Sequence, residues 1–172
     1  MKISKIDGLN PSGIERIDML AAFKISAIGY PDTNNQVDLL LAPNAEWENI
    51  YFTPKSGKME ITPDEDGAGD FYQIALTYSI PKFRGKIARY FNENIRRDNY
   101  LRITDRNGNK FLLGEIGNYP VIRIEHKSNF DETNAVLVRV ELQGSHPPYL
   151  IKTQENVNPD FASADFSTGF YV

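Results

Sequence analysis

The segment Tyr72–Ile80 restricts the fold of this chain most, because its large apolar residues occupy every second position. Successive side chains of a β-strand point to opposite faces, so this spacing predicts a strand with one face in a core. We expect Pro81 to end the strand, since proline has no N–H to donate to a ladder. The apolar positions are Tyr72, Ile74, Leu76, Tyr78 and Ile80.

A β-hairpin is predicted near the middle of the chain. Its strands are Tyr100–Thr104 and Lys110–Leu113, and the residues between them include Asn107 and Gly108. Both of these residue types tolerate the positive φ that tight hairpin turns require. Asp105 is expected to cap the turn by accepting hydrogen bonds through its side-chain oxygens.

Two more strands follow the hairpin. Ala135–Leu142 alternates between valine or leucine on one side and mostly polar residues on the other, and Val121–His126 is a shorter apolar run. Pro147 and Pro148 then favour an extended exit into Tyr149–Ile151. The second half of the chain is therefore predicted to consist mainly of strands.

The first half shows shorter apolar runs separated by proline and asparagine. Strands are predicted at Val37–Leu41, Glu48–Phe52 and Lys58–Ile61, with the first two in one sheet. Ser12–Leu20 is expected to be mostly extended. The acidic segment Pro63–Asp70 is interpreted as a loop, and its carboxylates are interpreted as solvated.

A single helix is predicted at Gly85–Arg97. Its apolar residues are spaced by three, one and four, which places them along one side of a helix. They are Ile87, Tyr90, Phe91 and Ile95. Arg89 and Arg96 belong to the charged opposite side, which is interpreted as solvated, with a partner surface as the alternative.

The fold class that follows is mainly β (α+β): an antiparallel β-sandwich or barrel of eight to ten strands with one flanking amphipathic helix. Alternation does not separate a sandwich from a barrel, since both bury one face of each strand. A chain of 172 residues can bury a sizeable core, and residues 1–153 are predicted to form one β-rich domain. Residues 154–172 are predicted to form a C-terminal arm with aromatic anchors, either mobile or docked.

Composition excludes several classes of function. A net charge of −4 disfavours nucleic-acid binding as the main task, because phosphate neutralisation needs a basic face. The absence of cysteine excludes disulfides, thiol nucleophiles and thiolate metal sites. Apolar runs such as Leu39–Pro43 are far shorter than the roughly 20 residues of a membrane span, and no signal-peptide pattern opens the chain. We therefore expect a cytoplasmic protein.

No candidate for a metal site is convincing. Asp105, Asn107 and Asn109 alternate as in a calcium loop, but Gly108 falls at the fourth position instead of the sixth. Ile116 stands at the twelfth position, where a bidentate glutamate is expected. The acidic residues around Gly67 and Gly69 offer at most a weak surface cation site. They are Asp64, Glu65, Asp66 and Asp70.

The sequence also lacks a reactive constellation. His126 and His146 are the only histidines and stand in unrelated contexts, so they are a poor start for a zinc site. No GxSxG elbow, phosphate-binding GxxxxGK loop or HExxH helix occurs. We assign no catalytic residue, cofactor or metal, although scattered carboxylates leave a glycosidase-type pair open.

The order of several motifs resembles a known group of proteins. IYFTPKSG, FYQIALTYSIPK, the helix from Gly85, ITDRNGNKFLLGEIGNYPVIRIEH and VELQGSHPPYLI are similar in order to small neck and tail structural proteins of tailed bacteriophages and prophages of gut anaerobes. The similarity spans Ile50–Ile151. One departure is Ser128–Glu132, where the group tends to carry a glycine-containing turn.

The resemblance implies a non-enzymatic virion protein of the tail-tube, tail-completion or head-tail joining type. Its expected partners are its own copies in a ring and other virion proteins, without a membrane or a specific nucleic-acid sequence. It would reside in the host cytoplasm and then in the virion. Candidate assembly contacts are Phe161, Phe166, Phe170, Tyr171, Arg89 and Arg96.

Two alternatives belong to other classes. A stand-alone β-sandwich carbohydrate-binding module would use Trp47, Tyr51 or Tyr119 as stacking platforms, although a sole tryptophan is more often a core or strand-end anchor. A glycoside hydrolase-like enzyme would use a carboxylate pair.

Overall fold

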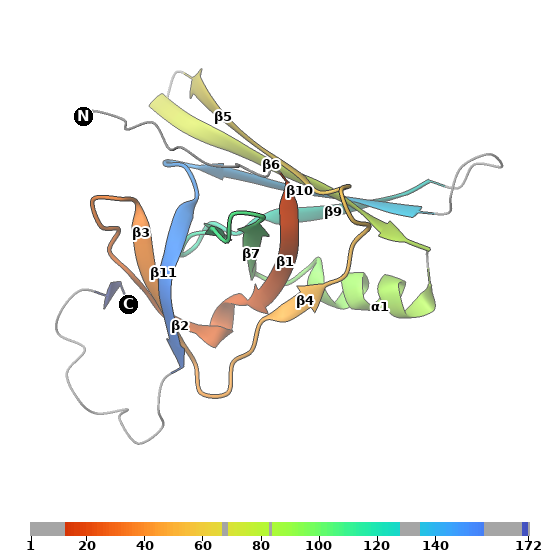
Figure 1. The fold of residues 1–172 in the computed structure, drawn as a ribbon, viewed down its shortest axis with the longest axis horizontal. Coiled ribbons are helices and arrows are strands. Elements are labelled where there is room, and N and C mark those ends of the chain that lie inside the picture. The colour runs from red at the N-terminus through yellow and green to blue at the C-terminus, as the bar shows by residue number, and fades with distance from the viewer. Residues whose placement is uncertain (1–12, 67–68, 83, 128–134, 157–169, 172) are drawn as a thin grey trace.

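The computed structural model describes residues 13–66, 69–82, 84–127, 135–156 and 170–171. Across these ranges the chain forms twelve strands, one α-helix and one short 3-10 helix (Figure 1). The strands lie in an eight-stranded sheet and a four-stranded sheet. The expectation of a mainly β fold with one helix is confirmed, with more strands than predicted.

The eight-stranded sheet is mixed. Its neighbouring strands pair antiparallel except β3 and β11, which are parallel and far apart in the chain. Residue spacing within either strand gives no sign of that pairing. In order across the sheet the strands are β12 (Phe170–Tyr171), β2 (Ile25–Gly29), β3 (Gln36–Leu41), β11 (Tyr149–Asn156), β8 (Lys110–Leu113), β7 (Asn99–Asp105), β1 (Ile14–Ala21) and β4 (Glu48–Ile50).

The four-stranded sheet is antiparallel throughout. Its two central strands contain the strongest alternation in the sequence, and Tyr78 lies opposite Val138 with both side chains buried. The predicted core faces of these strands are thereby confirmed. In order the strands are β5 (Lys58–Asp66), β6 (Gly69–Pro81), β10 (Ala135–Gly144) and β9 (Val121–Lys127).

The interpretation of Pro63–Asp70 as a loop is wrong. β5 continues to Asp66, and β6 begins at Gly69, so the acidic segment is the end of a hairpin. β5 is an edge strand that pairs with β6 alone among the described strands. Pro63 has no N–H to donate, and an edge strand tolerates this because it has no second neighbour to bind. The side chains of Asp64 and Glu65 are exposed there, so water solvates both carboxylates although the residues belong to a strand.

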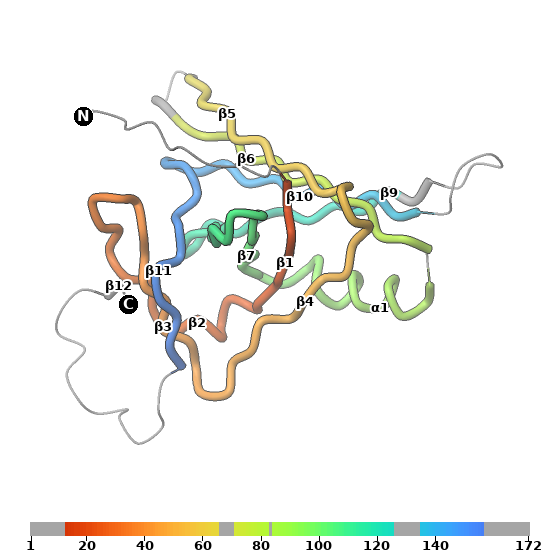
Figure 2. The backbone as a smooth tube through the Cα atoms, viewed as in Figure 1, coloured from red at the N-terminus to blue at the C-terminus, as the bar shows by residue number. Residues whose placement is uncertain are grey.

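The large sheet curls (Figures 1 and 2). The 3-10 helix η1 (Ala22–Lys24) joins β1 directly to β2. In the order of the sheet, however, β3, β11, β8 and β7 lie between β2 and β1, so the sheet curls round to bring these two strands together. The buried apolar side chains form two cores. The sandwich core lies against the four-stranded sheet and includes Ile17, Leu101 and Val138. The second core includes Leu39 and Tyr100 and uses the opposite face of β1 and β7.

Helix α1 (Gly85–Asn94) packs on the sandwich core as predicted. Phe91 is buried, and the other three apolar residues of its stripe pack against the same cluster. The helix ends before the predicted Arg97, because the buried side chain of Asn99 binds the carbonyl oxygens of Asn94 and Arg97 at 2.7 and 2.8 Å. Those contacts satisfy carbonyls that the helix leaves unpaired.

The expected boundary at residue 153 falls inside β11, which continues to Asn156. Further on, β12 places Phe170 opposite Gly29 and Tyr171 opposite Ile28 of β2. This part of the arm therefore docks on its own domain.

Candidate functional site

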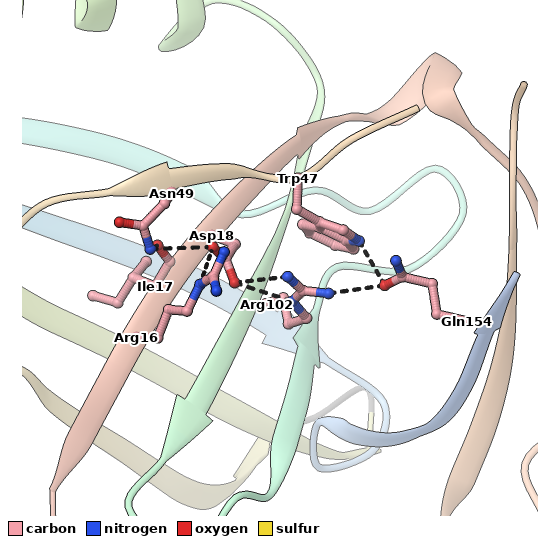
Figure 3. Close-up of polar contacts among 7 residues, drawn as sticks. All are labelled: Arg16, Ile17, Asp18, Trp47, Asn49, Arg102 and Gln154. Carbon is pink, nitrogen blue, oxygen red and sulfur yellow. Dashed lines mark hydrogen bonds and ion pairs between the residues drawn. The ribbon is translucent and has the colours of Figure 1, made fainter. Parts of the chain in front are cut away.

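A buried carboxylate on β1 organises the polar centre of the large sheet (Figure 3). The side chain of Asp18 is fully buried and accepts hydrogen bonds from Arg102 Nε at 3.1 Å and Nη2 at 2.9 Å. Arg16 Nε donates to it at 2.7 Å, and Asn49 Nδ2 donates at 3.2 Å. A buried charge is tolerated only with such compensation, so these contacts bind β1, β7 and β4 to one another.

Trp47 extends this network toward β11. Its indole Nε1 donates to Gln154 Oε1 at 2.7 Å, and Arg102 Nη1 donates to the same oxygen at 2.9 Å. The guanidinium of Arg102 lies 4.7 Å from the centre of the Trp47 ring, a cation–π distance. The tryptophan is thus an anchor immediately before β4, which agrees with the strand-end interpretation.

The network holds β4 at the edge of the large sheet. β4 pairs with β1 alone, so its other edge has no strand neighbour among the described residues. Directly after the strand, the side chain of Tyr51 is 74% exposed. A rigidly held strand edge with an exposed aromatic side chain is a candidate surface for another chain.

A groove of about 380 Å³ lies between β4 and α1. Its buried floor is apolar and includes Ile50, Ile80 and Phe91, whereas Arg84 and Lys86 are exposed at its rim. Asn49, Tyr51, Pro81, Ile87 and Tyr90 complete its lining. The groove therefore offers apolar contact area beside positive charge.

The half-buried Tyr90 lines this groove, and the fully buried Tyr78 lies near it. Burial, together with nearby Tyr90, raises the pKa of Tyr78 far above its ordinary value. Burial and the carboxylate of Glu48 raise the pKa of Tyr90 in the same direction. The hydroxyl of Tyr78 has no hydrogen-bond partner among the described residues. Both phenols are therefore neutral at physiological pH.

A second hollow lies between the start of β1 and the residues at and after the end of β4. It has a volume of about 260 Å³ and shares Asn49, Ile50 and Tyr51 with the groove. Arg16 and Arg106 contribute cationic side chains, and Glu15 contributes an acidic one. The residues at the end of β4 therefore line two hollows, the groove with α1 and this one with the start of β1.

A third hollow, of about 350 Å³, contains a histidine–carboxylate pair that sequence reasoning missed. His146 Nε2 lies 2.9 Å from Glu115 Oε1, and His146 Nδ1 lies 2.8 Å from the carbonyl oxygen of Pro147. Its ring stacks on Tyr149 at 3.9 Å. Both ring nitrogens face acceptors, so neither is free to take a proton from Ser145 in the same hollow.

Asp105 acts as the predicted turn cap. Its carboxylate accepts from the backbone N–H groups of Asn107 and Asn109 at 2.8 and 2.9 Å, and from Asn109 Nδ2 at 2.8 Å. Partial burial raises the pKa of Asp105, but these hydrogen bonds outweigh it and hold the pKa below its ordinary value. Within the described ranges, no cluster of three or more histidine, aspartate or glutamate side chains is arranged to hold a metal.

The predicted assembly contacts lie in different places. Arg89 is 79% exposed on α1 and pairs with Glu93 one turn later, at 2.7 Å. Arg96 lines a separate hollow next to Phe23, whose side chain is 77% exposed. Phe170 and Tyr171 form β12, and Phe161 and Phe166 lie outside the described residues.

The three predicted stacking platforms do not form one surface. Trp47 is engaged by Arg102 and Gln154, and Tyr119 packs edge-to-face on Tyr100 at 5.3 Å. Tyr51, directly after β4, is therefore the one of these three rings that is largely exposed, and the three do not form a shared platform.

Comparison of the chain with protein-family models, curated proteins and solved structures finds no match. None of the helices in the described ranges has the length and apolar character needed to cross a bilayer.

Proposed function

We propose that this protein is a non-enzymatic structural subunit of a tailed-bacteriophage or prophage particle, of the tail-tube, tail-completion or head-tail joining type. The observation that carries the proposal is the unpaired β4 edge, which has the groove between β4 and α1 and the exposed ring of Tyr51 beside it. Unpaired edges are templates for pairing with another chain. Because β4 has only three residues, its backbone offers few hydrogen bonds, and the groove and the ring of Tyr51 must supply most of the contact. The order of motifs across Ile50–Ile151 supports a phage particle as the setting.

The polar network supports this role by making the surface rigid. Asp18, Arg102 and Gln154 connect three strands of the curled sheet, and Asn49 connects β4 to them. A preorganised surface loses little conformational freedom when a partner binds, so more of the contact energy remains as affinity. Repeated contacts between different surfaces of identical subunits close into a ring when the rotation permits.

The mass of the purified protein in solution, measured by sedimentation over a range of concentrations, tests this proposal. We expect a defined oligomer, and we expect the protein to co-purify with particles from a culture that produces them. Tyr51→Asp should weaken the oligomer, because it places a charge on the proposed contact surface. Ile116→Asp is the matched control, since Ile116 is 56% exposed and lies away from β4.

The opposite outcome is also defined. A protein that stays monomeric at every concentration and is absent from particles contradicts the proposal. If that monomer bound immobilised glycans and lost binding in Tyr51→Ala, the carbohydrate-binding alternative would replace it.

A further inference from the structure

The groove between β4 and α1 sets the chemistry of what it can bind. Ile50, Ile80 and Phe91 are buried beneath it, so it favours apolar side chains. Arg84 and Lys86 are exposed at the rim, and neither forms an ion pair with another described residue. A fitting segment must present apolar side chains close to carboxylates.

One part of this chain has that chemistry. Residues 157–169 contain two Asp-Phe pairs, Asp160-Phe161 and Asp165-Phe166, and no lysine or arginine. Phenylalanine brings a large apolar area with only two rotatable side-chain bonds, which suits it as an anchor. The residues before β1 fit less well, because they bring two lysines against one aspartate to a groove that is already cationic.

The strands that flank this segment lie at a different end of the molecule from the groove. β11 ends at Asn156 and β12 begins at Phe170, and both stand on the side opposite α1 in Figure 1. Figure 2 shows the same separation along the backbone tube. A contact between them therefore joins one copy to the next.

We propose that the β4–α1 groove of one copy binds residues 160–166 of a second copy. The two phenyl rings occupy the apolar floor, and the two carboxylates lie beside Arg84 and Lys86. This inference rests on the proposed function and names the contact by which subunits join. Because the contact is heterologous, it repeats head to tail and closes into a ring when the geometry permits.

Cysteine cross-linking tests the contact directly, since the chain has no cysteine of its own. In Tyr51→Cys/Phe166→Cys, mild oxidation should link successive copies into a ladder of oligomers on a denaturing gel. Each single variant should stop at a dimer. Ile116→Cys/Phe166→Cys is the matched control and should give no ladder. An intrachain disulfide in the test variant would show that the segment reaches its own groove, which overturns the proposal.

Charge reversal provides an independent readout on the full chain. Arg84→Glu/Lys86→Glu should raise the dissociation constant for self-association, measured by sedimentation, at least tenfold, because attraction becomes repulsion. Lys110→Glu/Lys152→Glu changes the net charge equally at exposed positions away from the groove and should have little effect.

Adding Asp160→Lys/Asp165→Lys to the groove variant should restore association, which a merely destabilised fold would not do. If the wild-type protein assembles and the groove reversal leaves assembly unchanged, this contact is wrong while the proposed function stands. A wild-type protein that stays monomeric at every concentration and is absent from particles overturns both.

Discussion

Asp18 of β1 and Arg102 of β7 form a two-donor ion pair in which the carboxylate is fully buried and the guanidinium is 13% exposed. The same guanidinium binds Gln154 of β11, so one side chain connects the sheet centre to the strand that curls over the second core. The stability of the curled sheet and the position of β4 therefore depend on one buried charge.

Arg102→Met is expected to lower the free energy of unfolding by about 3–5 kcal/mol, because it leaves a buried carboxylate without its main compensation. Urea denaturation monitored by Trp47 fluorescence measures this loss. Arg16→Met removes another donor to the same carboxylate, but Arg16 is 50% exposed and water can replace it, so the loss should be below about 1 kcal/mol. Equal losses in the two variants would contradict the central role of Arg102.

Asp105→Ala should lower stability by about 1 kcal/mol, because three hydrogen bonds of the β7–β8 turn are lost. The pKa of Asp105 is held below its ordinary value in the folded state, so its contribution is present above about pH 4 and is lost as pH falls through the folded pKa. Denaturation at several pH values should show the wild-type advantage over Asp105→Ala constant near neutrality and shrinking in acid. An advantage that persists in strong acid would argue against a role for the ionised carboxylate.

Gly114→Ala should destabilise the fold by about 2 kcal/mol or more, since strain and a clash add together. Gly114 has φ +117°, and a Cβ there would lie 2.8 Å from Cδ1 of Tyr100 in the second core. Gly108→Ala is the matched control, because Gly108 has φ +83° but no atom within 4 Å of its would-be Cβ. Thermal denaturation of both variants separates the backbone strain, which both share, from the clash with Tyr100, which only Gly114→Ala has. Similar losses of stability in the two variants would show that a small shift relieves the clash.

Local patterns predicted the strands and the helix because those patterns report burial. The alternation of β6 and the stripe of α1 both face the sandwich core, and Asp105 caps its turn through contacts within four residues. The acidic end of β5 was missed because an edge strand tolerates charge and proline as readily as a loop does.

The candidate surface was not predictable in the same way. Apart from Arg16 on the same strand, the partners of Asp18 and Trp47 come from other strands up to 107 positions away, so no local spacing reveals them. Tyr51 was named as an exposed aromatic, but the groove beside it forms only when α1 packs next to β4. Glu115 and His146 likewise meet only through the fold.

Tyr78→Phe should raise the free energy of unfolding by about 1 kcal/mol at neutral pH, because it removes a buried hydroxyl that has no hydrogen-bond partner in the described structure. Tyr100→Phe is the control, since the Tyr100 hydroxyl is not among the buried polar atoms that lack a partner, so its removal should not stabilise the fold. Urea denaturation of both variants gives the comparison. Destabilisation by Tyr78→Phe would mean that the hydroxyl has a bound partner.

Alkaline pH gives Tyr78 a separate signature. Burial raises the pKa of Tyr78 in the folded state. Below the ordinary tyrosine pKa near 10, the phenol is protonated in both the folded and the unfolded chain, so its ionisation takes nothing from stability. Above that pH the unfolded chain releases the proton while the folded chain keeps it, and stability falls by about 1.4 kcal/mol per pH unit for each such tyrosine. The advantage of Tyr78→Phe over the wild type should therefore widen between about pH 10 and 11.5. Parallel pH profiles of the two proteins would show that the Tyr78 hydroxyl ionises in the folded state as freely as in the unfolded chain.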